Sequence, residues 1–209
     1  MKLSRTLLTA AAGLAMAASA LPAFAVTVYT LDNGGSAFAT PGNYGTVSMT
    51  QNGADVDFSI TLAAGFNFVS TGGPHDLFAF NGAGVALADI TNLTVAGGGT
   101  LAAHTPGADS PFGTFGFGID CTNCKNGGPG QQADPMTFKV VNALISDFES
   151  KSTGGNPNAF FSADVISGAN TGAVGSTGGV PNVPEPETYA QMLAGLGAVG
   201  IVARRRRAA

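Results

Sequence analysis

Hydrophobic and polar residues alternate most regularly in the stretch ADVDFSITL. Every second residue from Ala54 to Leu62 is apolar, and the residues between them are polar or charged. Because successive side chains of a strand point to opposite faces, one face of this segment is apolar and the other is exposed to water. The pattern predicts an antiparallel strand with one face on a core.

Eight further segments have the apolar, β-branched or aromatic content of short strands. They are 26–31, 46–50, 66–70, 76–81, 91–96, 112–119, 137–146 and 159–167. Turn residues rich in glycine and asparagine separate nearly all of them, since these residues tolerate the positive φ of tight turns. Residues 85–93 are the one candidate for a short helix. We therefore predict an all-β fold, an antiparallel β-sandwich or jelly-roll-like ectodomain over residues 26–166.

The first 25 residues have the three regions of a secretory signal peptide. Lys2 and Arg5 are basic, residues 7–21 carry no charge, and Ala23 and Ala25 form a small-residue cleavage site. We predict cleavage after Ala25. The segment is therefore set apart from the fold.

The end of the chain has a different pattern. Residues 167–182 lack apolar periodicity and are predicted to be a flexible linker rich in glycine, serine and asparagine. Residues 188–203 are uncharged and would form about 24 Å of helix, shorter than the ~30 Å hydrocarbon core of a bilayer. A basic cluster follows, composed of Arg204, Arg205, Arg206 and Arg207. By the positive-inside rule these arginines stay in the cytoplasm, so the ectodomain would lie outside the inner membrane.

The charge of the predicted ectodomain and linker is strongly negative. Residues 26–183 contain eleven acidic residues and three lysines, a formal charge of −8 against −4 for the whole chain. Such a surface repels phosphate backbones, so we expect no nucleic-acid partner. The length is sufficient for one domain with a real core.

Cys121 and Cys124 are the two cysteines of the chain and form a C-x-x-C pair. Such a pair can be a redox couple, half of a zinc site or a local disulfide. A redox couple normally lies at a helix N-terminus, whereas this pair follows a strand-like run and enters a glycine-rich loop. Export to an oxidising compartment favours a disulfide, whose short loop would stabilise the fold only modestly.

The remaining polar residues do not form a recognisable catalytic pattern. His75 and His104 are far apart and lack zinc-finger spacing, so each is predicted to be a surface or turn residue. Asp55 and Asp57 lie on one face of their strand, where they could share a cation, although two solvated charges are the favoured interpretation. Calcium in the loops rich in Asp, Asn and Gly is a further alternative. We predict no catalytic residue, no metal ligand and no cofactor.

Pro184, Glu185 and Pro186, followed by a short hydrophobic segment and a basic end, resemble the PEP-CTERM sorting signal over residues 183–209. The resemblance implies export by a Gram-negative bacterium and recognition of these three residues by an exosortase. The hydrophobic segment at 188–203 would hold the precursor transiently in the inner membrane.

The stretch FGFGIDCTNCKNGGPG and the later stretch FFSADVISGANTGAVGS are also similar to segments of PEP-CTERM ectodomains, although Lys125 stands where glycine is common. The resemblance implies a non-enzymatic protein at the cell surface or in the exopolysaccharide or biofilm matrix, with exopolysaccharide as a further expected partner. A carbohydrate- or calcium-binding module is the alternative. A periplasmic thiol protein that uses Cys121 and Cys124 is a more remote one.

Overall fold

The computed structural model describes residues 25–178. The predicted signal peptide up to residue 24, the PEP residues, the hydrophobic segment and the arginine cluster lie outside the described residues. Within residues 25–178 the chain forms fourteen strands and three short 3₁₀ helices. Every strand pair is antiparallel, so the prediction of an all-β antiparallel fold is confirmed.

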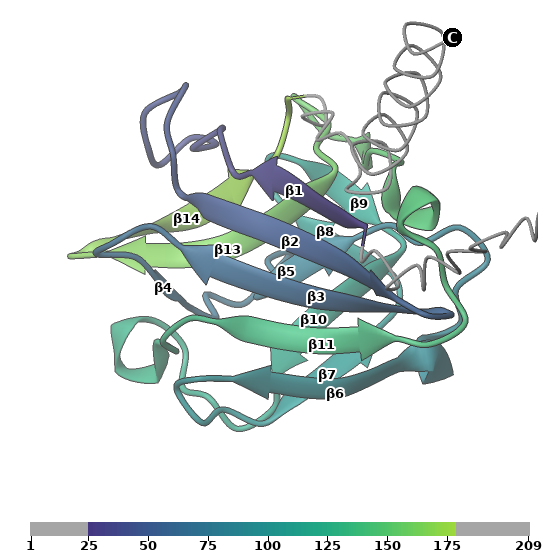
Figure 1. Ribbon diagram of the computed structural model, residues 1–209. Helices are drawn as coiled ribbons and strands as arrows, with labels where there is room; N and C mark the ends of the chain where they lie inside the picture. The colour runs from purple at the N-terminus through teal and green to yellow at the C-terminus, as the bar shows by residue number, and fades with distance from the viewer. Residues whose placement is uncertain (1–24, 179–209) are drawn as a thin grey trace, which may run out of the picture.

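The first sheet has five strands and forms one layer of the domain (Figure 1). Their order is β1 (Val26–Thr30), β2 (Gly45–Asn52), β3 (Asp55–Leu62), β11 (Met136–Val140) and β6 (Ile90–Val95). In β3 the apolar side chains are buried and the residues between them are mostly half-buried, as the alternating pattern predicted. Gly53 adopts a positive φ of 63° in the turn that joins β2 to β3.

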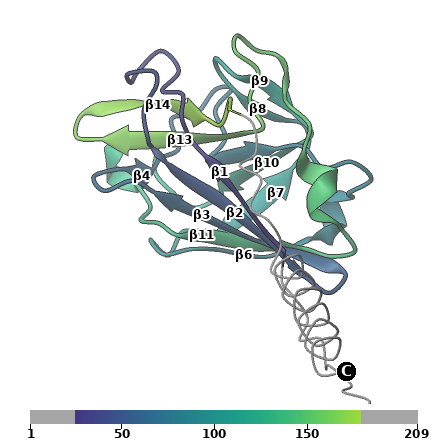
Figure 2. The same cartoon turned by 45° about the horizontal axis from the view of Figure 1, so that its top comes forward.

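The second sheet forms the other layer, and a small third sheet lies beyond it (Figure 2). The second sheet contains β14 (Asn170–Gly175), β13 (Phe161–Ser167), β5 (Phe78–Phe80), β10 (Phe117–Cys121) and β7 (Leu101–His104), with β4 (Asn67–Phe68) paired to β13. The third sheet contains β12 (Thr153–Gly154), β9 (Gly113–Phe115) and β8 (Gly107–Asp109). The 3₁₀ helices are η1 (Leu87–Asp89), η2 (Gly128–Gly130) and η3 (Ile145–Phe148).

Phenylalanine side chains fill the space between the two large sheets. Phe58 of β3 lies 5.7 Å, between ring centroids, from Phe80 of β5 in the opposite sheet. Within the first sheet it stacks on Phe138 of β11 at 4.4 Å. Full burial of each such ring stabilises the fold by roughly 1.5–3 kcal/mol. Ala79, Phe112, Phe115, Ala159 and Ala173 form a second cluster on the other face of the second sheet.

The predicted helix at 85–93 is wrong apart from a single 3₁₀ turn. Only Leu87–Asp89 is helical, and β6 begins at Ile90 and pairs with β11. Asn92 has a positive φ of 54° where the register with β11 shifts, so β6 contains an irregularity that obscures strand periodicity in the sequence. Pairing with β11 decides the conformation here.

The predicted flexible linker at 167–182 is wrong for residues 170–175, which form β14. This strand pairs with β13 along its whole length, and Val174 is fully buried. Gly172 is needed because a Cβ there would overlap Ala37. The glycines that suggested flexibility instead allow close packing in this strand.

The long segments predicted at 112–119 and 137–146 are each interrupted. Gly116, whose N–H donates to Asn81 Oδ1 at 2.7 Å, separates β9 from β10. Strand β11 ends at Val140, and η3 begins at Ile145. Within residues 25–178 no helix has the length and apolar character needed to cross a bilayer.

Candidate functional site

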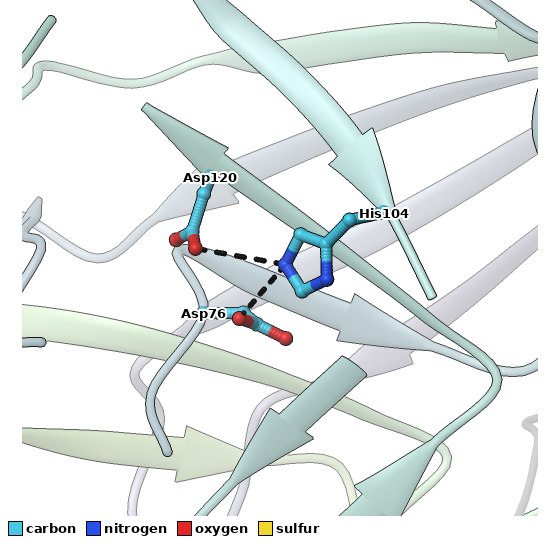
Figure 3. A group of neighbouring side chains, drawn as sticks. All are labelled: Asp76, His104 and Asp120. Atoms are coloured by element: carbon cyan, nitrogen blue, oxygen red, sulfur yellow. Dashed lines mark hydrogen bonds and ion pairs between the residues drawn. The ribbon is translucent and has the colours of Figure 1, made fainter. Parts of the chain in front are cut away.

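The outer face of the second sheet carries a cluster of three charged or ionisable side chains, Asp76, His104 and Asp120 (Figure 3). In β10, Phe117 and Ile119 point into the main core, so Asp120 points to the opposite face. His104 is the last residue of β7, which pairs with β10. Asp76 lies in the segment before β5, so three separate parts of the chain form the cluster.

The three side chains converge on one ring nitrogen of His104. Its Nε2 lies 3.1 Å from Asp76 Oδ1 and 3.5 Å from Asp120 Oδ2. Side-chain exposure is 8% for Asp76, 42% for His104 and 40% for Asp120. The cluster therefore has a buried carboxylate on one side and is open to solvent on the other.

Backbone groups hold each member of the cluster in place. The N–H of Ala108 donates to Asp76 Oδ2 at 2.7 Å, and the N–H of Leu77 donates to Asp120 Oδ1 at 3.3 Å. The Nδ1–H of His104 donates to the carbonyl of Pro106 at 3.1 Å, because a carbonyl can only accept. Each side chain thus has one polar atom fixed and directs the other to a common point.

Gly118 of β10 leaves the space that the cluster occupies. A Cβ at this position would overlap the Asp76 carboxylate and lie 2.7 Å from His104 Cε1. Any larger residue would displace Asp76 or His104. The glycine is therefore part of the construction of the cluster.

Burial dominates the electrostatics of Asp76. Desolvation raises the pKa of its carboxyl above the ordinary value, and the hydrogen bond from Ala108 and the imidazole of His104 oppose that shift. The negative charge of Asp120 raises the pKa of Asp76 further. A positive species between the two carboxylates would relieve both the burial and the repulsion.

A second polar cluster contains His75, Asp109 and Ser162, but it is not arranged as a catalytic triad. Asp109 is fully buried and lies between the other two: Oδ1 is 3.0 Å from His75 Nδ1, and Oδ2 accepts a hydrogen bond from Ser162. In a triad the histidine contacts the serine directly, so that it can take the serine proton. Here the carboxyl separates them.

Burial sets the pKa of Asp109 as well. Desolvation raises the pKa of its carboxyl to about 7, against lowering contributions from His75 and Ser162. The hydrogen bond to Asp109 in turn raises the pKa of His75. The pair is therefore built to retain a proton at a pH where an exposed aspartate is ionised.

Asp164 of β13 is a third buried carboxyl. Thr71 donates to its Oδ2 through both the backbone N–H and the hydroxyl. Its Oδ1 is buried and has no hydrogen-bond partner among the described residues. Burial raises the pKa of Asp164, which is consistent with a protonated carboxyl.

The structure brings the two predicted disulfide cysteines together. The sulfur atoms of Cys121 and Cys124 lie at bonding distance, with the Cα atoms 5.5 Å apart. Cys121 ends β10, and η2 begins only at Gly128, so neither thiol lies at a helix N-terminus. A Cβ at Gly99 would lie 2.8 Å and 2.9 Å from the two sulfurs, so the backbone of Gly99 covers the pair closely.

Asp55 and Asp57 do share a cation, and it is a lysine. The Nζ of Lys139 in β11 lies 3.2 Å from Asp55 Oδ2 and 3.3 Å from Asp57 Oδ1. Their interpretation as two merely solvated charges is therefore wrong. The register of β11 with β3 places Lys139 directly opposite Asp57.

The prediction that the two histidines are isolated turn residues is also wrong. Each contacts at least one aspartate that is distant in the sequence, and Asp76 and His104 are separated by 28 positions. The polar residue at an outward position of β10, Asp120, was the available signal. It could not be interpreted without the register of β10 against β7.

The class of the protein is defined by the segment that follows the β domain. A family model described as the PEP-CTERM protein-sorting motif matches residues 182–207. The chain is therefore a protein with a PEP-CTERM sorting signal, as the resemblance of its C-terminal segment predicted. The motif implies export, a membrane-anchored precursor and processing by an exosortase. No curated protein and no solved structure matches the chain.

Proposed function

We propose that this protein is a non-enzymatic component of the cell surface or of the exopolysaccharide matrix of a Gram-negative bacterium, delivered by an exosortase. The observation that carries the proposal is the sorting motif at residues 182–207. Pro184, Glu185 and Pro186 are the recognition residues, and Arg204 to Arg207 hold the precursor in the inner membrane until processing.

The position of the folded domain supports this proposal. Its strands run from Val26 to Gly175, directly after the proposed cleavage at Ala25 and before the sorting motif. Removal of both terminal segments would therefore leave all fourteen strands. The acidic surface also suits a hydrated matrix, because like charge limits association of the domain with itself.

The geometry of the potential catalytic groups is consistent with a non-enzymatic role. Ser162 is fully buried and bonds to Asp109 instead of His75, so it lacks a general base. Cys121 and Cys124 lie at bonding distance in a loop, which favours a structural disulfide over the thiol alternative.

The sorting proposal is tested by replacing the recognition residues in the native host. The triple variant Pro184→Ala/Glu185→Ala/Pro186→Ala should accumulate in the inner membrane at the mass of the unprocessed precursor. Glu187→Ala, which removes the neighbouring acid outside the motif, is the matched control and should be processed normally. Release of the triple variant with wild-type mass and yield would refute the role of these residues.

The matrix role is tested separately by deletion of the gene. We expect altered flocculation or matrix retention, restored by the wild-type gene and not by the triple variant. Unchanged matrix and surface properties, together with turnover of a substrate by the purified protein, would overturn the non-enzymatic assignment.

A carbohydrate-binding module is the second candidate, favoured by a surface cavity of about 430 Å³ beside His75. Hydroxyl side chains line it, among them Ser36, Thr71, Ser110 and Thr171. Such groups can hydrogen-bond sugar hydroxyls. Calorimetry with the polysaccharide of the host, with and without EDTA, should then give heat of binding, and no heat in either condition would exclude this alternative.

A further inference from the structure

We propose that Asp76, His104 and Asp120 bind a divalent transition-metal ion of the Zn²⁺ or Mn²⁺ class. Among residues 25–178 this is the one group in which three such side chains each direct a ligand atom to a common point, with all three atoms within 4.8 Å of one another. The proposal concerns the folded domain alone and does not depend on the sorting proposal.

The hydrogen bond of His104 to Pro106 identifies which ring nitrogen is available. Since the carbonyl of Pro106 accepts, Nδ1 carries the hydrogen, and in the neutral imidazole Nε2 has only a lone pair. That lone pair faces two carboxylate oxygens. The arrangement needs a positive species at Nε2, and a metal ion satisfies all three atoms at once. Histidine ligands commonly donate their second ring N–H to a backbone carbonyl in this way.

The buried carboxylate of Asp76 provides a second, independent indication. Its side chain is more than nine-tenths buried, and Ala108 supplies a donor to Oδ2 only. Oδ1 points to His104 Nε2 and has no donor there while the imidazole is neutral. A buried carboxylate oxygen without a donor is costly, whereas a metal ligand bond compensates for its burial.

The separations of the ligand atoms match the size of such an ion. Metal–ligand distances of about 2.0–2.2 Å place adjacent ligand atoms about 3.0–3.5 Å apart in octahedral or tetrahedral geometry. His104 Nε2 lies 3.1 Å and 3.5 Å from the two aspartate oxygens. The ligand atoms are therefore already spaced for coordination without movement of the strands.

The donor set selects the class of metal. One imidazole and two carboxylates suit zinc, manganese or iron(II), whereas calcium prefers oxygen ligands throughout. The half-exposed side chains of His104 and Asp120 leave the remaining coordination positions open to water or to an oxygen of an external ligand.

The competing interpretation is an ion pair in which a protonated His104 bridges the two carboxylates. Asp55, Asp57 and Lys139 show how this chain neutralises two carboxylates with a side-chain cation. That cluster contains a lysine, which has no lone pair for a metal when charged. It therefore serves as the internal comparison for the experiment.

The experiment is isothermal titration calorimetry on the full chain, purified in detergent without a polyhistidine tag and stripped with EDTA. Titration with ZnCl₂ should give one ion per chain. Asp120→Asn and His104→Asn should each weaken binding at least about tenfold, which is the lower range found for loss of a supporting partner. Asn at position 104 can retain the donor to Pro106 while it lacks Nε2.

The controls separate loss of the site from loss of the fold. Asp57→Asn removes a carboxylate from the lysine cluster and should bind Zn²⁺ as the wild type does. Melting in EDTA checks that each variant is folded, and if one ligand variant does not fold, the other decides the result.

Two results would overturn the proposal. The first is a folded wild-type protein that binds neither Zn²⁺ nor Mn²⁺, which would leave the ion pair as the explanation of the cluster. The second is equal Zn²⁺ affinity in the wild type and both ligand variants, which would place the ion elsewhere. Binding of CaCl₂ that depends on Asp120 would contradict the assigned metal class.

Discussion

Asp109 is the residue at which burial opposes ionisation most strongly. Its side chain has no exposure, yet it lies between the imidazole of His75 and the hydroxyl of Ser162, which both act to lower its pKa. Burial has the larger effect and raises the pKa of Asp109 to about 7. Because the folded pKa exceeds the ordinary value of 3.8, this carboxyl contributes stability that is fully present below about pH 4. That contribution is lost as the pH rises towards 7.

Asp109→Asn should therefore reduce the dependence of stability on pH. The amide has the shape of the carboxyl, can accept the hydrogen bond from Ser162 and does not ionise. We expect the wild-type protein to lose a few kcal/mol of unfolding free energy between pH 4.5 and 7.5, since each pKa unit corresponds to about 1.4 kcal/mol. The variant should lose clearly less, measured by urea denaturation across this range.

The raised pKa of His75 acts in the same direction at higher pH. Its stabilising contribution is complete below its ordinary value of 6.5 and declines above it. Glu149→Gln, at an exposed position, serves as the control and should keep the wild-type slope. Equal slopes in the wild type and Asp109→Asn would show that Asp109 does not take up a proton on folding.

At the scale of the elements, the end of β10 and the loop after it depend on close backbone contacts. Gly130 approaches the backbone of Lys125 so closely that a Cβ would overlap its carbonyl. Gly99 packs in the same way against Cys121 and Cys124. The loop is therefore held by packing as well as by the cysteine pair.

Removal of the cysteine pair should destabilise the domain only modestly. The loop between Cys121 and Cys124 is so short that loop-closure entropy contributes about 2 kcal/mol. The double variant Cys121→Ala/Cys124→Ala should lose about this much unfolding free energy, measured in urea. The oxidised wild type treated with a reductant should fall to a similar value. No response to the reductant would contradict a formed disulfide.

At the scale of the whole molecule, the folded unit includes more of the chain than the predicted ectodomain at 26–166. Strand β14 completes the edge of the second sheet, and Asp32 then accepts hydrogen bonds from Thr177 N–H at 2.8 Å and Gly178 N–H at 3.1 Å. Gly175 also exchanges backbone hydrogen bonds with Asn33. These contacts join the end of the domain to its beginning.

A truncated chain of residues 26–178 should consequently unfold cooperatively, with the same midpoint in urea as residues 26–183. A chain of residues 26–169 lacks β14 and leaves one edge of β13 unpaired, so it should fail to give a cooperative transition. Circular dichroism during urea titration measures both. Cooperative unfolding of the shorter chain at the wild-type midpoint would show that β14 is dispensable.

The strands that could be predicted are those whose pattern is local. In β3 one face is buried and the other is more exposed, so its residue order alone indicates a strand. In β14 the residues are Asn, Thr, Gly, Ala and Val, a composition that is equally typical of a linker. Its conformation depends on hydrogen bonds from β13, which no local pattern records.

The sequence by itself determined the all-β class, the alternating strand β3 and the sorting motif at 182–207, because each is a linear pattern of neighbouring residues. Only the tertiary structure decided that Asp76, His104 and Asp120 meet. Pairing of Gly118 with His104 sets the register of β10 against β7, and the segment before β5 brings in Asp76. A contact between positions 28 residues apart depends on register and packing, which follow from the fold as a whole.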